Sequence, residues 1–277
     1  MLLQAARKRQ LPTVLALFLC LPFAACSRGQ PTPGQSAVDC AVAPAQLQEF
    51  RVARVSDGDT LRLAGGDKVR LIGINTPELG HGGEAGQPLA EEARAALSAL
   101  VADGRVWLQD GPEARDPHGR RLAWAFDARG EGIATQLLRQ GLGFHVAIAP
   151  NTARAQCLAA AEAAARAARL GVWGIAEYRP RSVSGLEPGY RGFALLQDRV
   201  TRVSFKENGW WLQLAGKVGV KIGPGSQSLY SRSALEALQG QAVQVRGWLV
   251  PMRGGWWVLT LGHPSMLASP GETRERE

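Results

Sequence analysis

The chain has 277 residues, of which 45% are hydrophobic. This is enough apolar material for one large or two small domains with buried cores, so the composition excludes a wholly disordered protein. The formal net charge of +8 suits a polyanionic partner without showing that one exists.

The first 25 residues have the layout of a bacterial signal peptide. Arg7, Lys8 and Arg9 precede a nearly unbroken apolar run over residues 11–25. A helix of that length reaches about 22 Å, which is short of a hydrocarbon core of roughly 30 Å. We therefore expect an exported protein with no transmembrane helix in its mature form.

Small residues before Cys26 resemble a bacterial lipobox, with Phe23 at a position where lipoprotein processing favours an apolar residue. This predicts that Cys26 is lipidated and anchors the protein in the bacterial envelope, at the outer membrane. The lipid would be the sole membrane contact. The alternative is a soluble periplasmic or secreted protein. Residues 26–49, rich in Pro, Gly, Ser and Gln, then form a flexible tether.

Two cysteines remain for the mature domain, Cys40 and Cys157, because Cys20 is lost with the signal peptide. In an oxidising compartment they are expected to form a disulfide. The alternative is that Cys157 is merely buried on an alanine-rich helix.

The elements predicted for residues 50–175 alternate between short strands and helices. Strands are expected at residues 51–56, 60–63, 68–74, 106–109 and 122–127, and helices at 88–102, at 133–139 and from a cap at Asn151 or Thr152 to residues 170–171. A polar loop is expected at 110–121. The predicted fold is β-rich α+β, an OB-type five-stranded barrel with three helices.

Residues 176–189 are rich in Pro, Ser and Gly and predict a linker. Residues 190–268 alternate apolar and polar in short runs, which is typical of an all-β module. Two hairpins, 200–214 and 243–261, with a helix at 233–238 between them, favour a second, smaller OB-like barrel. Residues 269–277 form a charged tail that we expect to be disordered.

Three motifs in the first domain carry chemistry. They are Asp57-Gly58-Asp59-Thr60, then Arg70 followed by Asn75-Thr76-Pro77-Glu78, then Asp116-Pro117-His118-Gly119-Arg120. Each alone fits a turn or a surface charge. Together on one barrel they supply two guanidinium groups, an acidic cation site and a free carboxylate. Phosphodiester hydrolysis needs this set, because negative charge grows on an already anionic substrate.

By these motifs, and by the closing Leu170-Gly171-Val172-Trp173, residues 51–173 resemble a staphylococcal-thermonuclease-type domain. The resemblance implies calcium-dependent hydrolysis of DNA and RNA. It places Asp59 and the Thr76 carbonyl on calcium ligands and Asp57 on an acid near the metal. It places Glu78 on the general base and Arg70 and Arg120 on the phosphate-binding arginines.

The sequence departs from this family at three positions. Asn75 replaces an aspartate ligand, which removes one negative charge although an amide oxygen can still coordinate calcium. His118 and Ala147 replace tyrosines beside the nucleotide, so base stacking should change and His118 is a candidate substrate contact. Glu84, in the loop after Glu78, is a hypothetical source of the missing charge.

The second module has two tryptophan pairs, Trp210-Trp211 and Trp256-Trp257. Each pair on a strand should point one ring inward and one outward. Trp211 and Trp257 are the rings we consider for base stacking, while packing at a barrel end or against the first domain is the alternative. Five basic residues add positive charge to this module, and the alternative is that they form only a solvated face: Lys217, Lys221, Arg232, Arg246 and Arg253.

The sequence thus predicts an exported, metal-dependent nuclease acting on DNA, RNA or both. The competing hypothesis is a weak or inactive thermonuclease-like domain that serves as a nucleic-acid-binding or envelope scaffold module. Retention of Glu78 and both arginines favours the enzyme, and Asn75 favours the scaffold.

Overall fold

The structure is a computed structural model that describes residues 40–80, 82–206 and 209–268. The predicted signal peptide, Cys26, most of the tether and the C-terminal tail lie outside the described residues. Within the described residues, no helix has both the length and the hydrophobicity needed to span a bilayer.

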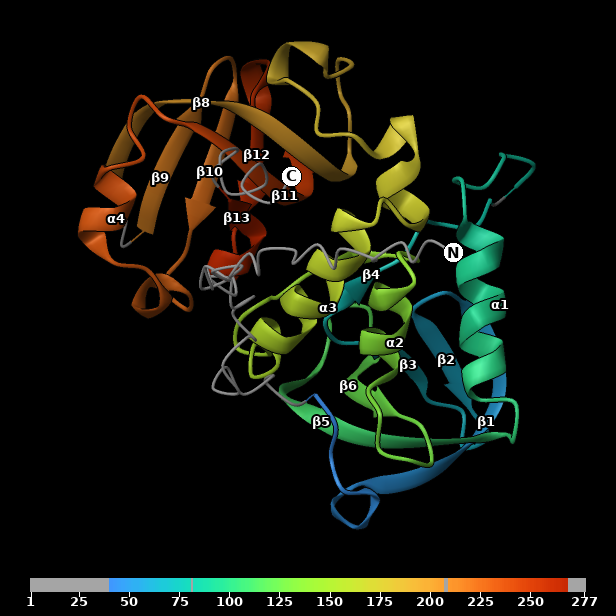
Figure 1. The fold of residues 1–277 in the computed structure, drawn as a ribbon. Coiled ribbons are helices and arrows are strands. Elements are labelled where there is room, and N and C mark those ends of the chain that lie inside the picture. Colours follow the sequence, from blue (N-terminus) through green and yellow to red (C-terminus); the bar gives the residue numbers. More distant parts are fainter. Residues whose placement is uncertain (1–39, 81, 207–208, 269–277) are drawn as a thin grey trace, which may run out of the picture. The chain divides into compact units, whose positions relative to one another are not determined.

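Five strands of the first domain close into a barrel in the order β1-β2-β3-β6-β5 (Figure 1). They are β1 (Gln48–Asp57), β2 (Thr60–Leu63), β3 (Lys68–Leu71), β5 (Arg105–Arg115) and β6 (Arg121–Phe126). β3 and β6 run parallel and the other neighbours antiparallel. With α1 (Ala90–Leu100), α2 (Ile133–Arg139) and α3 (Ala155–Ala167), this confirms the predicted OB-type barrel with three helices.

Strand alternation explains the barrel core. Leu61 on β2 and Val69 on β3 are fully buried, and Leu97 of α1 and Leu137 of α2 pack into the same cluster. Apolar residues at period two on the strands and at helical spacing on α1 place one apolar face of each element inward.

A second barrel follows, with β8 (Gly192–Lys206), β9 (Gly209–Leu214), β10 (Val218–Ile222), β11 (Ala242–Pro251) and β12 (Trp257–Thr260). β12 pairs with both β10 and β11, which closes the ring, and β13 (Leu267–Ala268) adds to the edge of β11. α4 (Arg232–Glu236) lies between β10 and β11. The predicted second all-β, OB-like module is therefore present.

The two barrels share one strand order. In each, the third and fifth strands are parallel, and a helix connects the third strand to the fourth. Short 3-10 helices lie at Pro44–Gln46, Gly171–Gly174, Ala176–Tyr178, Val183–Gly185, Gln227–Leu229, Arg253–Gly255 and Pro264–Met266.

The strand predicted at residues 68–74 is divided in two, so that prediction was wrong in detail. β3 ends at Leu71, and β4 (Ile74–Asn75) leaves the barrel to pair with β7 (Phe144–His145). Gly73 between them has φ of 96°, and the Leu158 side chain fills the space where its Cβ would lie. This left-handed turn redirects the chain.

Two further boundaries differ from the sequence prediction. β5 continues to Arg115, which pairs with Arg121, so part of the predicted loop is strand. The third helix begins at Ala155, and neither Asn151 nor Thr152 caps it. The Asn151 side chain instead accepts from the Glu113 backbone N–H and donates to its carbonyl, at 3.0 Å each.

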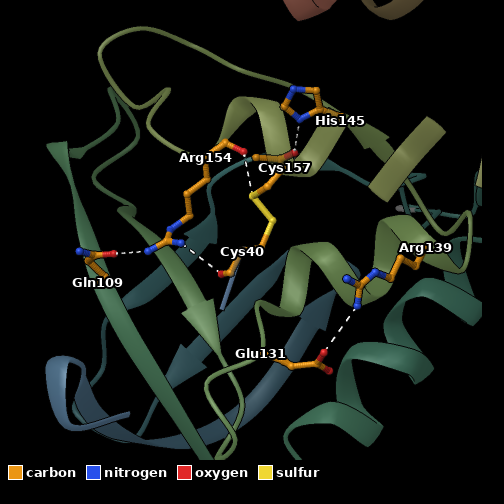
Figure 2. Close-up of a disulfide and its surroundings, with 8 residues drawn as sticks. Cys40, Gln109, Glu131, Arg139, His145, Arg154 and Cys157 are labelled. Atoms are coloured by element: carbon orange, nitrogen blue, oxygen red, sulfur yellow. Dashed lines mark hydrogen bonds and ion pairs between the residues drawn. A yellow bond between two sulfur atoms is a disulfide. The ribbon is translucent and has the colours of Figure 1, made fainter. Parts of the chain in front are cut away.

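Cys40 and Cys157 form a disulfide that spans 117 residues of sequence (Figure 2). It ties the segment before β1 to α3. Arg154 reinforces this link by donating to the Cys40 carbonyl at 3.1 Å and to Gln109 at 2.9 Å. Of the two alternatives left open by the sequence, the structure contains the disulfide.

A buried ion pair joins α3 to the second barrel. Arg246 Nη1 on β11 lies 2.5 Å from Glu162 Oε1, and the side chains are 12% and 4% exposed. The same carboxylate oxygen accepts from the His145 backbone N–H at 2.6 Å. Because both barrels belong to one compact unit, this contact fixes β11 against the first domain.

We predict that Arg246→Met lowers the free energy of unfolding by about 3 to 5 kcal/mol, because the Glu162 carboxylate would stay buried without its cation. Urea unfolding measures the change. Arg94→Met, which breaks the exposed pair with Glu91, should cost under about 1 kcal/mol. The double variant Glu162→Gln/Arg246→Met should recover part of the loss, and equal effects of Arg246→Met and Arg94→Met would contradict this account.

Candidate functional site

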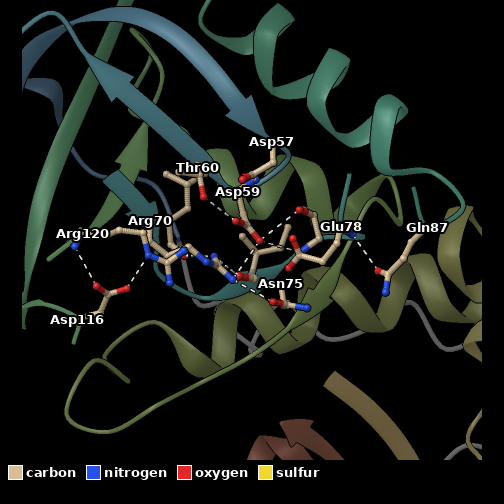
Figure 3. A network of polar contacts seen from close by, with 12 residues as sticks. Asp57, Asp59, Thr60, Arg70, Asn75, Glu78, Gln87, Asp116 and Arg120 are labelled. Carbon is tan, nitrogen blue, oxygen red and sulfur yellow. Dashed lines mark hydrogen bonds and ion pairs between the residues drawn. The ribbon is translucent and has the colours of Figure 1, made fainter. Parts of the chain in front are cut away.

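A tight turn between β1 and β2 places the first acids of the site (Figure 3). The Asp59 backbone N–H donates to Asp57 Oδ1 at 3.1 Å, which closes the turn locally. Gly58 is buried against α1 and Thr76, and a Cβ there would lie 2.6 Å from the Ala93 Cβ. Only glycine fits this approach, so the turn is pressed against the helix.

Asp59 is 5% exposed. Its carboxylate accepts hydrogen bonds from donors in three segments. Oδ2 accepts from the Thr76 backbone N–H at 2.9 Å and from its hydroxyl at 3.2 Å. Oδ1 accepts from the Thr60 hydroxyl at 3.1 Å. Arg70 Nη2 lies 3.0 Å from Oδ2 and supplies the opposite charge.

Arg70, on β3, uses most of its N–H donors in hydrogen bonds within the protein. Nη1 donates to the carbonyls of Leu71 at 2.8 Å and Ile74 at 2.7 Å, and Nη2 donates to Asn75 Oδ1 at 3.0 Å. Together with the Asp59 contact, this satisfies both terminal nitrogens. Arg70 thus joins Asp59 and Asn75, which the sequence predicts as cation ligands.

Glu78 follows β4 and opens into the cleft. Its backbone is fixed by Gln87, whose side chain accepts from the Glu78 N–H and whose N–H donates to the Glu78 carbonyl, both at 2.9 Å. Desolvation in the cleft, then the charges of Asp59 and Asp57, raise the pKa of the Glu78 carboxyl above its ordinary value. A carboxylate with a raised pKa is a stronger base.

Arg120 is positioned by Asp116, which accepts from Arg120 Nε at 2.6 Å and from its backbone N–H at 2.9 Å. Burial alone would raise the pKa of Asp116, but the hydrogen bonds and charge of Arg120 outweigh it and lower that pKa. The two terminal nitrogens of Arg120 have no acceptor within the described chain. They are free to bind an anion.

These side chains line a cleft of about 380 Å³ that contains Arg70, Asn75, Glu78 and Arg120. An adjoining hollow of about 420 Å³ shares Asn75 and Glu78. Trp248 from β11 of the second barrel borders both. Its ring is 36% exposed and meets Phe193 edge-on at 5.2 Å. The second barrel therefore contributes an aromatic wall to the cleft.

The structure places the other predicted residues as follows. His118 lines the cleft, and its backbone N–H donates to Asp116 at 2.9 Å. Ala147 is buried, and its backbone carbonyl packs against Gly262, which follows β12. Glu84 is exposed in its loop and forms no ion pair with the described residues.

Known proteins resemble part of this chain. The family model described as staphylococcal nuclease homologue matches residues 68–174, which include Arg70, Asn75, Glu78 and Arg120. A thermonuclease of Staphylococcus intermedius is 30% identical over 131 residues, covering 46% of this chain and 76% of that protein. The chain belongs to the staphylococcal nuclease family.

Two other relatives match over a smaller share of their own length. A protein named probable endonuclease LCL3 from Colletotrichum graminicola is 30% identical over 154 residues, covering 44% of this chain and 56% of that protein. A namesake from Eremothecium gossypii is 37% identical over 79 residues, covering 27% and 28%. The chain thus spans between about a quarter and about half of these two relatives.

Staphylococcal nuclease homology implies a divalent cation, and the oxygen donors here suit one. Asp59 offers a carboxylate and Asn75 an amide oxygen, and both meet at Arg70 Nη2. Hard divalent cations take such ligands. The described residues contain no group of three or more His, Cys, Asp or Glu that could hold a metal. Asp59 and Asn75 thus offer one carboxylate and one amide oxygen, which is less negative charge than a site of several carboxylates.

Sequence reasoning missed two features of this site. Asp116 is the partner that orients Arg120, and its position four residues earlier in the same motif was a usable signal. Trp248 had no such signal, because its place in the cleft depends on how the second barrel packs.

Proposed function

We propose that this protein is a nuclease that hydrolyses phosphodiester bonds of DNA, RNA or both. One observation carries the proposal: the Glu78 carboxylate and the terminal nitrogens of Arg120 line the same cleft, and none of these groups has a partner among the described residues. A base beside a guanidinium whose two terminal nitrogens can still donate suits attack on a phosphodiester.

In this mechanism Arg120 binds two oxygens of the phosphate, with Asp116 holding the guanidinium in place. Glu78 takes a proton from a water molecule while the oxygen of that water attacks phosphorus. The bond between phosphorus and the leaving oxygen breaks. Arg120 offsets the negative charge that grows on the phosphate oxygens. Arg70 contributes positive charge to the same cleft while its terminal nitrogens keep Asp59 and Asn75 in position.

Asp59, Asn75 and the Thr76 carbonyl are the residues that would hold a divalent cation, which we propose is calcium. When bound, the cation would supply further positive charge beside the phosphate. Desolvation, and then the charge of Asp59, raise the pKa of Asp57.

Export is part of the same proposal. A disulfide between Cys40 and Cys157 suits an oxidising compartment. Removal of residues 1–25, lipidation of Cys26 and attachment to the bacterial envelope extend this proposal to residues outside the described part of the chain.

We predict that Glu78→Gln lowers the rate of cleavage of a single-stranded DNA oligonucleotide at least about 100-fold, because the amide cannot accept the proton of water. Chelation with EDTA should also abolish cleavage. Gel analysis of the products measures both. Glu84→Gln is the matched control, because it changes an exposed carboxylate of the same loop. If Glu78→Gln cleaves as fast as the parent, the base is misassigned. Binding without cleavage by the parent would favour a non-catalytic module.

We predict that Asn75→Asp increases calcium affinity by about tenfold or more, because a second carboxylate would face the cation. Isothermal titration calorimetry measures this change without reference to activity. Glu84→Ala should leave the affinity unchanged if Glu84 takes no part, and a weaker affinity would assign it a role. Equal affinities of the parent and Asn75→Asp would contradict the site.

We predict that Trp248→Ala raises KM for a single-stranded oligonucleotide by about tenfold while kcat changes little, because a stacked base would lose its aromatic partner. Trp248→Phe should retain most of the affinity. Leu229→Ala removes an exposed apolar side chain from the same barrel outside both hollows. An unchanged KM in Trp248→Ala would show that the ring does not contact substrate.

A further inference from the structure

The second barrel has a groove of its own, of about 610 Å³. It lies on the outer face of β8, β9 and β10, strands that run side by side in Figure 1, and the β11–β12 loop forms one of its walls. In OB-type barrels this is the face on which extended polymers bind, between the loops that join the first two and the last two strands.

Strand alternation on β9 places one tryptophan in this groove. Leu212 and Leu214 are fully buried in the barrel core, so Trp211 points outward. Its ring lies against Gly219 of β10, where a Cβ would come within 3.2 Å of the ring. Lys221 Nζ lies 5.6 Å from the ring centroid. The ring is therefore held on a part of the sheet that has no side chain beneath it.

A second ring stands on the loop wall. Trp256 is 38% exposed, and Lys217 Nζ donates to the carbonyl of Gly254 in this loop at 3.0 Å. Trp257 packs against the barrel core instead, and its indole N–H donates to the Tyr190 carbonyl at 2.8 Å. Trp256 is thus the more exposed ring of this pair, and Trp257 also lines the groove.

The groove is cationic. Arg202, Lys206 and Arg253 line it, and no acid is among the described residues that line it. None of the three forms an ion pair with a described acid. Residues 192–268 contain eight arginines and lysines against three acids. Unpaired cations around two fixed aromatic rings match a ligand with regular negative charge and flat apolar faces.

We propose that this groove is a second binding site, for single-stranded nucleic acid, separate from the cleft around Glu78. The bases stack on Trp211 and Trp256, and the phosphates lie along Arg202, Lys206 and Arg253. A duplex does not fit this chemistry, because its base faces are already stacked on one another. The choice of ligand rests on the proposed nuclease function, and the site would hold the strand that the cleft cuts.

Binding is tested on the full chain carrying Glu78→Gln, with EDTA, so that the result does not depend on cleavage. Fluorescence anisotropy of a labelled thymidine 12-mer gives Kd. Trp211→Ala and, separately, Trp256→Ala should each weaken binding about tenfold. Trp211→Phe should retain most of the affinity, and unchanged melting temperatures show that the variants fold. Unchanged Kd in both alanine variants overturns the proposal.

The phosphate contacts are tested by salt dependence. Arg202→Ala/Lys206→Ala should reduce the slope of log Kd against log salt by about 1.4, since each phosphate contact on a single strand contributes about 0.7. The control Arg94→Ala/Arg139→Ala removes two charges from the first barrel. Equal slopes in the two double variants overturn the proposal. So does loss of heparin binding in the groove variants with thymidine 12-mer binding intact, because it would identify an acidic polysaccharide as the ligand.

Discussion

The buried ion pair between Asp59 and Arg70 is the interaction on which the cleft depends. Two charges that are 7% and 12% exposed are stable in a protein interior only when their remaining hydrogen-bonding atoms are also satisfied. Asp59 therefore accepts a hydrogen bond from the backbone N–H of Thr76, and Arg70 donates one to the carbonyl of Ile74. The β1–β2 turn, β3 and the segment after β4 must converge for this to happen. Glu78, two residues after Thr76, is carried to the cleft by that convergence.

Much of this site could be predicted from sequence because its signals are local. Turn residues mark the Asp57–Thr60 connection, and alternating apolar residues mark the strands that bring the motifs together. The structure places Arg70, Glu78 and Arg120 around one cleft, as the motifs indicate. The break after Leu71 was missed, because residues 68–74 are mostly apolar and β-prone, as in a single strand. The turn at Gly73 packs against Leu158, which lies far along the chain.

Trp248 marks the limit of such reasoning. Trp248 lies on β11 with an exposed ring, as any residue on the outer face of a strand can. No motif near it in the sequence relates it to Glu78. Its location depends on the pair between Glu162 and Arg246, which joins residues 84 positions apart and leaves no pattern at either end. The replacement of the family's tyrosine by Ala147 can be explained only once this packing is known. The second barrel covers that position, so an aromatic wall for the cleft comes from a different domain.

The two barrels show that strand order alone does not determine chemistry. Both connect five strands in the same sequence, with one parallel pair and a helix before the fourth strand. The first barrel buries a carboxylate at the turn between its first two strands and must then neutralise it, which assembles charged groups in a cleft. In the second barrel, Arg202, Lys206 and Arg253 instead line a groove beside Trp211. Burial of charge thus separates a site suited to bond breaking from a face suited to holding a polymer.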